Sequence, residues 1–245
     1  MRVIIPAAGL GSRLRPYTDS IPKCMVEIAG RTLIERMLSH LYDCKVTEVV
    51  CVVGYRRKEL IRHVSGLIRR PPVRFVVNEA FASTNSMASL CCVGQDVWSA
   101  AVVVIDSDLA LAPRLLKTVV TPGADTLVVD RSRTPAEIDM GVQLRDDGSI
   151  FHMSKDPKEA RFDAEFFGLS RWTALGARAL YREMQRQLGD GALGDWYQFA
   201  IRDLAKHRHI ASLGVMSSNE WVEVDSSEDL ERARSAYKRG KVAWG

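Results

Sequence analysis

The sequence predicts an α/β fold with a Rossmann-like, mostly parallel sheet, helices on both of its faces and a β-rich insertion. Three observations lead to this prediction. Short, continuous apolar runs alternate with segments of helical periodicity in the first half of the chain, which is typical of strands joined by helices. These runs show no polar alternation, as expected for parallel strands buried on both faces. In the second half, shorter strand-like runs and a hairpin signal replace this pattern.

Four apolar runs predict the buried strands of the first half. They span residues 2–8, 48–53, 73–77 and 101–105. Helices are expected over residues 32–41 and 58–68, because apolar residues recur there at helical spacing. The apolar stripe of the second helix comprises Leu60, Ile61, Val64, Leu67 and Ile68. Residues 85–93 are typical of the start of a further helix.

The second half is expected to contribute short strands and three helices. The strands span residues 125–130, 141–145, 149–154, 164–169 and, late in the chain, 221–224. Asp146-Asp147-Gly148 is a hairpin turn signal between two of them. Helices are expected over residues 175–188, 194–206 and 226–237, the last capped by Ser226 or Ser227. Because no Pro/Ser-rich linker or internal repeat divides the chain, we expect a single domain over residues 1–245.

Composition excludes several classes of protein. With 47% apolar and 26% charged residues, the 245-residue chain is neither disordered, collagen-like nor a coiled coil. The net charge of +4 suits an anionic substrate but not nucleic acid, and the basic stretch from Arg56 is interpreted as a solvated helix face. No apolar run approaches the roughly 18 residues of a membrane span, and residues 1–11 lack the features of a signal peptide. The five cysteines, without a C-x-x-C pair, are expected as buried free thiols in a reducing cytoplasm.

A glycine-rich turn follows the first predicted strand. In Ala7-Ala8-Gly9-Leu10-Gly11-Ser12-Arg13, the glycines allow backbone N–H groups to approach an anion, and Arg13 is suited to clamp a phosphate. The turn is neither a dinucleotide-binding fingerprint nor a P-loop, and a plain strand-to-helix turn is the alternative. Lys23 follows Pro22, which fixes the backbone, and could neutralise a transferring phosphoryl group, or be a surface lysine.

Together these elements resemble a known family. Gly9-x-Gly11-x-Arg13 followed by Pro22-Lys23, within PAAGLGSRL and PKCMVEIAG, is similar to nucleotidyltransferases that activate phosphorylated small molecules with an NTP. The segments VNE at residues 77–79, TNSMASL at 84–90 and WVEVD at 221–225 resemble its branch of phosphocholine and phosphonate cytidylyltransferases. The resemblance implies Mg²⁺-dependent transfer of CMP from CTP to a phosphocholine-like or phosphonate acceptor, with release of pyrophosphate.

The resemblance also implies roles for individual residues. Arg13 and Lys23 are the implied catalytic residues. The implied nucleotide-binding residues are Ala7, Ala8, Gly9, Gly11, Ser12, Arg13, Lys23, Asn78, Thr84, Asn85, Ser86, Ser89 and Asp106. Helix capping is the alternative for Thr84 and Ser86. The implied metal ligands are Asp108 and Asp225, whose carboxylates suit Mg²⁺. Both follow apolar strands and are expected at the C-terminal edge of one sheet; Asp106 and Glu223 are further candidate ligands, and an N-cap is the alternative for Asp225.

The acceptor site is expected to combine aromatic and charged residues. The candidates are Lys155, Glu165, Trp196, Tyr197 and Trp221, with Arg133 as a second phosphate clamp. An aromatic box with a carboxylate suits a quaternary ammonium, whereas a primary amine favours carboxylates. Core packing is the alternative for the tryptophans and the tyrosine.

On this basis the chain divides into three functional regions. Residues 1–130 form the nucleotide-binding core, 131–220 the acceptor-binding region, and 221–245 the metal-binding strand and closing helix. The alternatives are sugar-1-phosphate nucleotidylyl transfer, a metal-dependent glycosyltransferase built on Asp106-Ser107-Asp108, and a nucleotide-binding regulatory subunit without catalysis. The expected partners are CTP and a small acceptor, without nucleic acid or membrane. The acceptor and the oligomeric state stay open, a homo-oligomer included.

Overall fold

Four apolar strands pair in parallel and form one half of the central sheet. They are β1 (Arg2–Ala7), β4 (Glu48–Val53), β5 (Val73–Val77) and β6 (Val102–Ile105). Their spatial order is β6-β1-β4-β5, and Ile4 of β1 lies opposite Val50 of β4 and Val104 of β6. The computed structural model, which describes residues 1–156, 158–159, 161–215 and 219–244, thus confirms the predicted parallel core.

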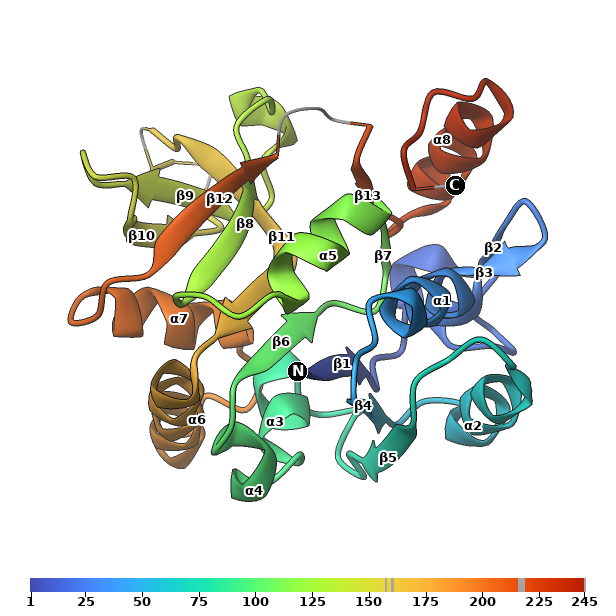
Figure 1. Ribbon diagram of the computed structural model, residues 1–245, viewed down its shortest axis with the longest axis horizontal. Helices are drawn as coiled ribbons and strands as arrows, with labels where there is room; N and C mark the ends of the chain where they lie inside the picture. Colours follow the sequence, from blue (N-terminus) through green and yellow to red (C-terminus); the bar gives the residue numbers. More distant parts are fainter. Residues whose placement is uncertain (157, 160, 216–218, 245) are drawn as a thin grey trace.

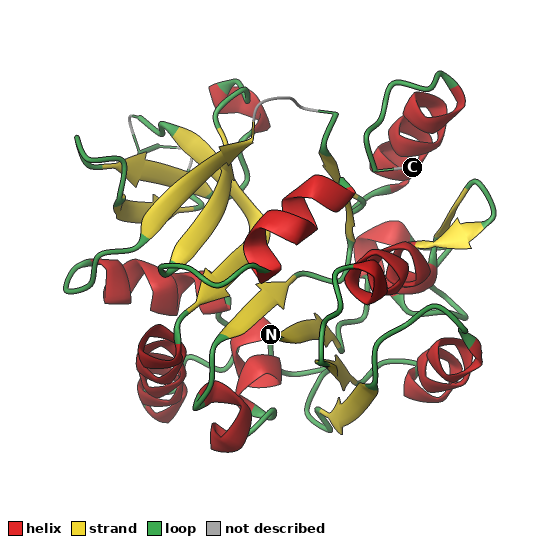
Figure 2. Ribbon diagram, viewed as in Figure 1, coloured by secondary structure: helices red, strands yellow, loops and turns green. Residues whose placement is uncertain are grey.

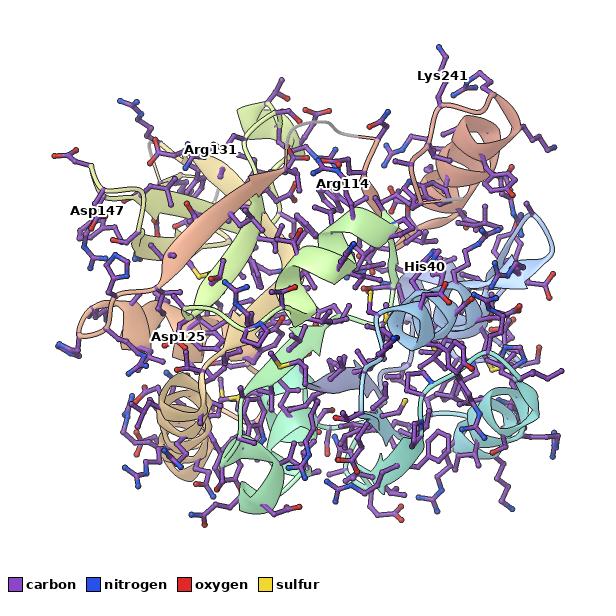
Figure 3. The ribbon with its side chains drawn as sticks, viewed as in Figure 1. His40, Arg114, Asp125, Arg131, Asp147 and Lys241 are labelled. Atoms are coloured by element: carbon purple, nitrogen blue, oxygen red, sulfur yellow. The ribbon has the colours of Figure 1, made fainter. Side chains whose placement is uncertain are left out.

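The second half of the chain extends the same sheet, mainly with antiparallel strands (Figure 2). These strands are β8 (Thr126–Asp130), β9 (Gly141–Leu144), β10 (Ile150–Ser154), β11 (Ala164–Trp172) and β12 (Ala211–Val215). The long β11 joins the halves because it pairs antiparallel with β6 as well as with β8 and β9. The predicted hairpin turn is confirmed between β9 and β10, with Asp147 at its tip (Figure 3). The expected β-rich region is present, and it continues the central sheet.

Helices cover both faces of this sheet (Figure 1). They are α1 (Leu33–Asp43), α2 (Arg57–Gly66), α3 (Ser86–Cys91), α4 (Gln95–Trp98), α5 (Pro113–Val120), α6 (Ala174–Gly189), α7 (Tyr197–Ala205) and α8 (Ser227–Lys238). Successive side chains of a strand point to opposite faces, so Val3 and Ile5 pack with α1, α2 and α5. Ile4 packs on the other face with α3, α4, α6 and α7.

Several local predictions need correction. Helix α2 ends at Gly66, so Ile68 is not part of its stripe and is 95% exposed. Helix α7 begins at Tyr197 rather than at residue 194. The elements α4, α5, β12 and the small strands β2, β3 and β7, described next, were not predicted from the sequence, although Pro113 at the start of α5 is a helix-start signal. The predicted late strand over residues 221–224 is confirmed as β13. All five cysteines are free, but only Cys24 and Cys51 are buried; Cys44 and Cys91 are half-buried, and Cys92 is exposed.

Two small sheets lie outside the central sheet. The strand β13 (Trp221–Glu223) pairs antiparallel with β7 (Leu109–Leu111), and β2 (Glu27–Ile28) pairs with β3 (Arg31–Thr32). Helix α8 packs through Leu230 against Leu14 and Ile28 near the start of the chain (Figure 1). In the described part of the chain, no helix is both long and apolar enough to cross a bilayer.

Candidate active site

A cavity of about 340 Å³ opens beyond the carboxyl ends of β1 and β6. This is the edge of an open α/β sheet at which ligands bind. Most of the residues singled out from the sequence line it: Ala7, Ala8, Gly9, Gly11, Ser12, Arg13, Lys23, Thr84, Asn85, Ser86, Ser89, Asp106, Asp108, Lys155, Glu165, Trp196 and Asp225. Further lining residues, without an assigned role, include Phe81, Asp139, Met140, Phe166, Phe167 and Gln198.

The glycine-rich loop passes close to Lys23. Gly11 adopts a left-handed conformation with φ of 62°, and a Cβ atom there would lie 3.0 Å from Cβ of Lys23. The Thr18 hydroxyl donates to the Gly11 carbonyl at 2.8 Å, and the Tyr55 hydroxyl donates to the Thr18 carbonyl at 2.9 Å. These contacts hold the loop beside the lysine, so the two sequence motifs form one wall of the cavity.

Lys23 forms the centre of a charged cluster. It opens a short 3₁₀ turn, Lys23–Met25, directly after Pro22. Its Nζ donates to Oδ2 of Asp108 at 2.5 Å and also to Oδ1 of Asp225, which pairs in addition with Arg13. Burial lowers the pKa of Lys23, but the Asp108 and Asp225 carboxylates raise it by more, so the net pKa is above its ordinary value. The lysine therefore stays charged between the two carboxylates.

Three carboxylates next to Lys23 are arranged as a cation site. Asp108, Glu223 and Asp225 each offer an oxygen, and these atoms lie within 4.8 Å of one another. Oδ1 of Asp108 is buried and accepts no hydrogen bond from the described residues. Burial raises the pKa of Glu223, and the neighbouring Asp108 raises it further. A crowded set of hard oxygen donors fits a divalent ion such as Mg²⁺.

The register of the small sheet brings these carboxylates together. Glu223 of β13 lies opposite Leu109 of β7, and the Val224 N–H donates to the Asp108 carbonyl at 3.0 Å. The expectation that Asp108 and Asp225 follow strands of one sheet is therefore wrong: Asp108 follows β6 of the central sheet, whereas Asp225 follows β13. They converge because Asp108 also directly precedes β7, the partner of β13.

Asn78 does not reach the cavity. It is buried, and its amide donates to the hydroxyls of Thr84 at 3.1 Å and Ser89 at 3.0 Å, while its oxygen accepts from the Ala80 N–H at 3.0 Å. Asn78 therefore orders the loop that carries the cavity residues instead of lining the cavity. Asn85 caps α3 and also donates to the Gly194 carbonyl at 3.1 Å, which ties this loop to the segment before Trp196.

At the other end of the cavity, an ammonium group rests on an indole ring. Nζ of Lys155 lies 4.5 Å from the centroid of Trp196 and 2.5 Å from Oδ2 of Asp139. The Asp139 N–H donates in turn to Oε1 of Glu165 at 3.1 Å. An aromatic face and a carboxylate thus hold one cation jointly, which is an arrangement suited to an ammonium ligand.

Two aromatic residues expected at the acceptor site belong to the core instead. Tyr197 is completely buried in the first turn of α7, where burial raises the pKa of its phenol and the nearby Asp106 raises it further. Trp221 is buried against Phe167, with ring centroids 4.1 Å apart. The sequence alone does not fix which face of a helix or strand an aromatic residue occupies. Arg133 does not line the cavity either; it pairs with Glu165 at 3.2 Å.

Some residues of the cavity were not predicted from the sequence. They differ in whether a sequence motif could have identified them. Phe81 lies between Asn78 and Thr84, which the motif analysis singled out, so extending that motif would have included it. Asp139 and Gln198 stand in no recognised motif, and only the folded chain brings them to the cavity.

Comparisons with known proteins agree with this geometry. Residues 3–208 match the family model of the MobA-like NTP transferase domain. The choline-phosphate cytidylyltransferase of Streptococcus pneumoniae is 26% identical over 97% of this chain and 99% of its own. The 2-aminoethylphosphonate cytidylyltransferase of Lancefieldella rimae is 25% identical over 98% of this chain and 92% of its own. The solved structure of the Streptococcus pneumoniae CTP:phosphocholine cytidylyltransferase is similar in fold, with a TM-score of 0.81 at 24% identity, covering 96% of this chain and 98% of that one.

Proposed function

Because this chain belongs to the family of MobA-like NTP transferases, and is a nucleotidyltransferase, we propose that it transfers CMP from CTP to a small phosphate or phosphonate that carries an ammonium group. One observation carries the proposal. A single cavity combines a phosphate-binding end, at Arg13 and Lys23, with a cation-binding end at Trp196. The triphosphate of CTP would match the first end, and the ammonium group of an acceptor would match the second. The choice of CTP follows the two cytidylyltransferases to which the chain is similar.

The phosphate-binding end would receive the triphosphate of CTP. The glycine-rich loop offers backbone N–H groups, and Arg13 and Lys23 supply positive charge. Two anions must approach each other in this reaction, so cancelling their repulsion is the main task of the site. Lys23 is suited to this task because its ammonium is charged, largely buried and already held between two carboxylates.

Asp108, Glu223 and Asp225 would hold Mg²⁺. When bound, the ion supplies charge neutralisation and orients the triphosphate. In the proposed transfer, an oxygen of the acceptor's phosphate or phosphonate attacks the α-phosphorus of CTP in line with the leaving pyrophosphate. The bond between the α-phosphorus and the α–β bridging oxygen breaks, and its electron pair leaves with pyrophosphate. No side chain is needed as a covalent nucleophile.

The cation-binding end would receive the acceptor's ammonium group. Lys155 shows that an ammonium fits between Trp196 and Asp139, because its own Nζ lies there. A bound acceptor would take this place and leave Lys155 free to pair with the acceptor's phosphate. The sequence-based candidates Trp196, Glu165 and Lys155 keep their proposed roles, whereas Tyr197 and Trp221 lose theirs. The free cysteines fit a reducing compartment, so we place the reaction in the cytoplasm.

Pyrophosphate release tests the proposal. Purified protein with Mg²⁺ and each of the four NTPs would be assayed against phosphocholine, 2-aminoethylphosphonate, 2-hydroxyethylphosphonate and glucose 1-phosphate. We expect release with CTP and an ammonium-bearing acceptor. Release only with UTP or dTTP and glucose 1-phosphate would instead establish sugar-1-phosphate nucleotidylyl transfer. Release with CTP and 2-hydroxyethylphosphonate but neither ammonium compound would refute the cation-binding end.

Substitution of Trp196 tests that end by itself. Trp196→Ala should raise the KM for the ammonium-bearing acceptor about fivefold, since Trp196 is 38% exposed and a cation–π contact at an exposed ring contributes up to about 1 kcal/mol. The KM for CTP should not change. Tyr42→Ala is the matched control, because Tyr42 is an exposed aromatic residue on α1, remote from the cavity. Equal acceptor KM values in both variants would contradict the role of Trp196.

A further inference from the structure

Trp221 links the small sheet to the central sheet. It is the first residue of β13, and its indole is buried. Its Nε1 donates to Oδ2 of Asp130 at 2.8 Å. Asp130 is the last residue of β8 and is completely buried. This hydrogen bond therefore fixes β13, whose only strand partner among the described residues is the short β7, to a strand of the large sheet.

Both oxygens of the Asp130 carboxylate accept hydrogen bonds. Its Oδ1 accepts from the N–H of Ser132 at 2.7 Å and from the hydroxyl of Ser132 at 2.6 Å, which leaves Oδ2 to the indole. Arg133 lies 3.6 Å from Oδ2, and its guanidinium stands 4.7 Å from the centroid of the Trp221 ring. Phe167 stacks on the same ring at an angle of 12°. The orientation of Trp221 is thus set by three neighbours.

That orientation determines where the metal-binding carboxylates point. In a strand, residues two apart project to the same face, so the direction of Trp221 fixes that of Glu223, with Asp225 directly following the strand. A shift of one residue would turn Glu223 to the other face. A two-stranded sheet with strands of three residues is only marginally stable by itself, so it needs an external anchor.

We propose that Asp130 and Trp221 are positioning residues that hold Glu223 and Asp225 in place for the divalent cation. This inference rests on the metal site of the proposed function. It replaces the acceptor contact that the sequence suggested for Trp221 with a structural role in placing the metal-binding carboxylates. Arg133 assists because it neutralises Asp130 and covers the indole ring.

The variant Trp221→Phe tests this inference, since it keeps an aromatic ring on Phe167 and removes the N–H that reaches Asp130. Trp172→Phe is the matched control: Trp172 is equally buried, and its Nε1 donates to Ser170 Oγ at 2.9 Å within β11. Mn²⁺ binding would be measured by electron paramagnetic resonance on the whole chain without nucleotide or acceptor. We expect Trp221→Phe to weaken Mn²⁺ binding about tenfold, the loss typical when a group that orients metal ligands is removed. Trp172→Phe should bind Mn²⁺ like the unmodified protein.

Further outcomes separate this inference from the proposed function. Unchanged Mn²⁺ affinity in Trp221→Phe, or an equal loss in Trp172→Phe, would overturn the positioning role while leaving the metal site intact. Absence of Mn²⁺ binding by the unmodified protein would overturn the metal site and the positioning role together.

Turnover assays of Trp221→Phe give a second readout. This variant should need a higher Mg²⁺ concentration for turnover, and its KM for the acceptor should be unchanged. A raised acceptor KM with normal Mn²⁺ binding would return Trp221 to the acceptor site. Asp130→Leu gives a second, independent variant and should match or exceed the loss in Trp221→Phe.

Discussion

Lys23 stands where two aspartates from distant parts of the chain meet. Its ammonium contacts Asp108 and Asp225 and is the nearest positive charge to the three-carboxylate cluster. With a triphosphate and a metal ion bound, the same ammonium would be free to bind phosphate oxygens, because the metal would then neutralise the carboxylates. The proximity of Lys23 to the glycine-rich loop follows from the close packing at Gly11.

Lys23→Ala should reduce turnover at least about 100-fold, as expected when one preorganised charged donor to the transition state is lost. The fold should survive, since Lys23 is part of no core cluster. Turnover would be measured by pyrophosphate release, with folding monitored by circular dichroism. Lys58→Ala, at an exposed position on α2, serves as the control. Turnover close to that of the control would contradict the role of Lys23.

Gly168 allows the Asp106 side chain to lie against the backbone of β11. Gly168 has φ of 96°, and a Cβ atom there would overlap the Asp106 carboxylate. Gly168→Ala should therefore lower the free energy of unfolding by about 1–3 kcal/mol. In Gly189→Ala, the Cβ atom would meet no heavy atom within 4 Å, and stability should be unchanged or rise by up to about 1 kcal/mol. Urea denaturation would measure the free energy of unfolding of both variants. An equal loss of stability in both would show that steric overlap at Gly168 does not cause the destabilisation.

Motifs predicted the residues of the phosphate-binding end, but not which aromatic residues reach the acceptor end. Arg13, Lys23, Asp108 and Asp225 belong to short patterns whose chemistry is tied to charge, and the structure brings all four to one cavity. Tyr197 and Trp221 were assigned to the acceptor because aromatic rings suit an ammonium group and because their segments resemble those of the family. Burial of a ring depends on the packing of neighbouring elements, which no local pattern specifies.

The strand β13 and helix α8 form a unit that presents Asp225. Ser226 caps α8, and Asp229 completes a capping box. Oδ2 of Asp229 accepts from the N–H groups of Asp225 at 3.1 Å and Ser226 at 2.8 Å. At the other end of β13, Arg114 of α5 pairs with Glu220 (Figure 3). The segment that carries Glu223 and Asp225, which we propose as metal ligands, is thus held on both sides.

Asp229→Ala should lower the free energy of unfolding by about 1 kcal/mol through loss of the cap, and should raise the Mg²⁺ concentration needed for half-maximal turnover. The second effect follows because the Asp225 backbone loses its hydrogen-bond acceptor. Glu231→Ala is the control, since Glu231 is 60% exposed and its one ion pair with a described residue is with Arg234 on the same helix. Exposed pairs of this kind contribute little, so stability should change by less than about 0.5 kcal/mol. If Asp229→Ala left the Mg²⁺ concentration for half-maximal turnover unchanged, the helix cap would have no role in placing the metal ligands.

Elements with a strong local pattern were predicted well, and those defined by pairing were not. The apolar runs of β4 and β5 match the structure residue for residue. The three-residue strand β7 was missed because it lacks the length to show a pattern, and it is a strand only because β13 pairs with it. Yet this pairing places Asp225 beside Asp108, so the proposed metal site depends on the part of the fold that was hardest to predict.

Across the whole molecule, the chain closes on itself around the cavity. Helix α8 packs on residues near the start of the chain (Figure 1), and Asp225, between β13 and α8, pairs with Arg13 of the loop that follows β1. The strands of the second half extend the central sheet and bring Lys155 and Trp196 to the opposite end of the same cavity. The fold class was predictable from alternating strands and helices, whereas the joining of two binding ends in one cavity is a property of the complete fold.

The central claim is that an acceptor oxygen attacks the α-phosphorus of CTP, and isotope transfer tests it most directly. The protein would be incubated with Mg²⁺, CTP and phosphocholine or 2-aminoethylphosphonate labelled with ¹⁸O in its phosphate or phosphonate group. Mass spectrometry of the products should find the complete label in the cytidine-containing product and none in pyrophosphate. Label in pyrophosphate, or no cytidine product with either acceptor, would contradict the account.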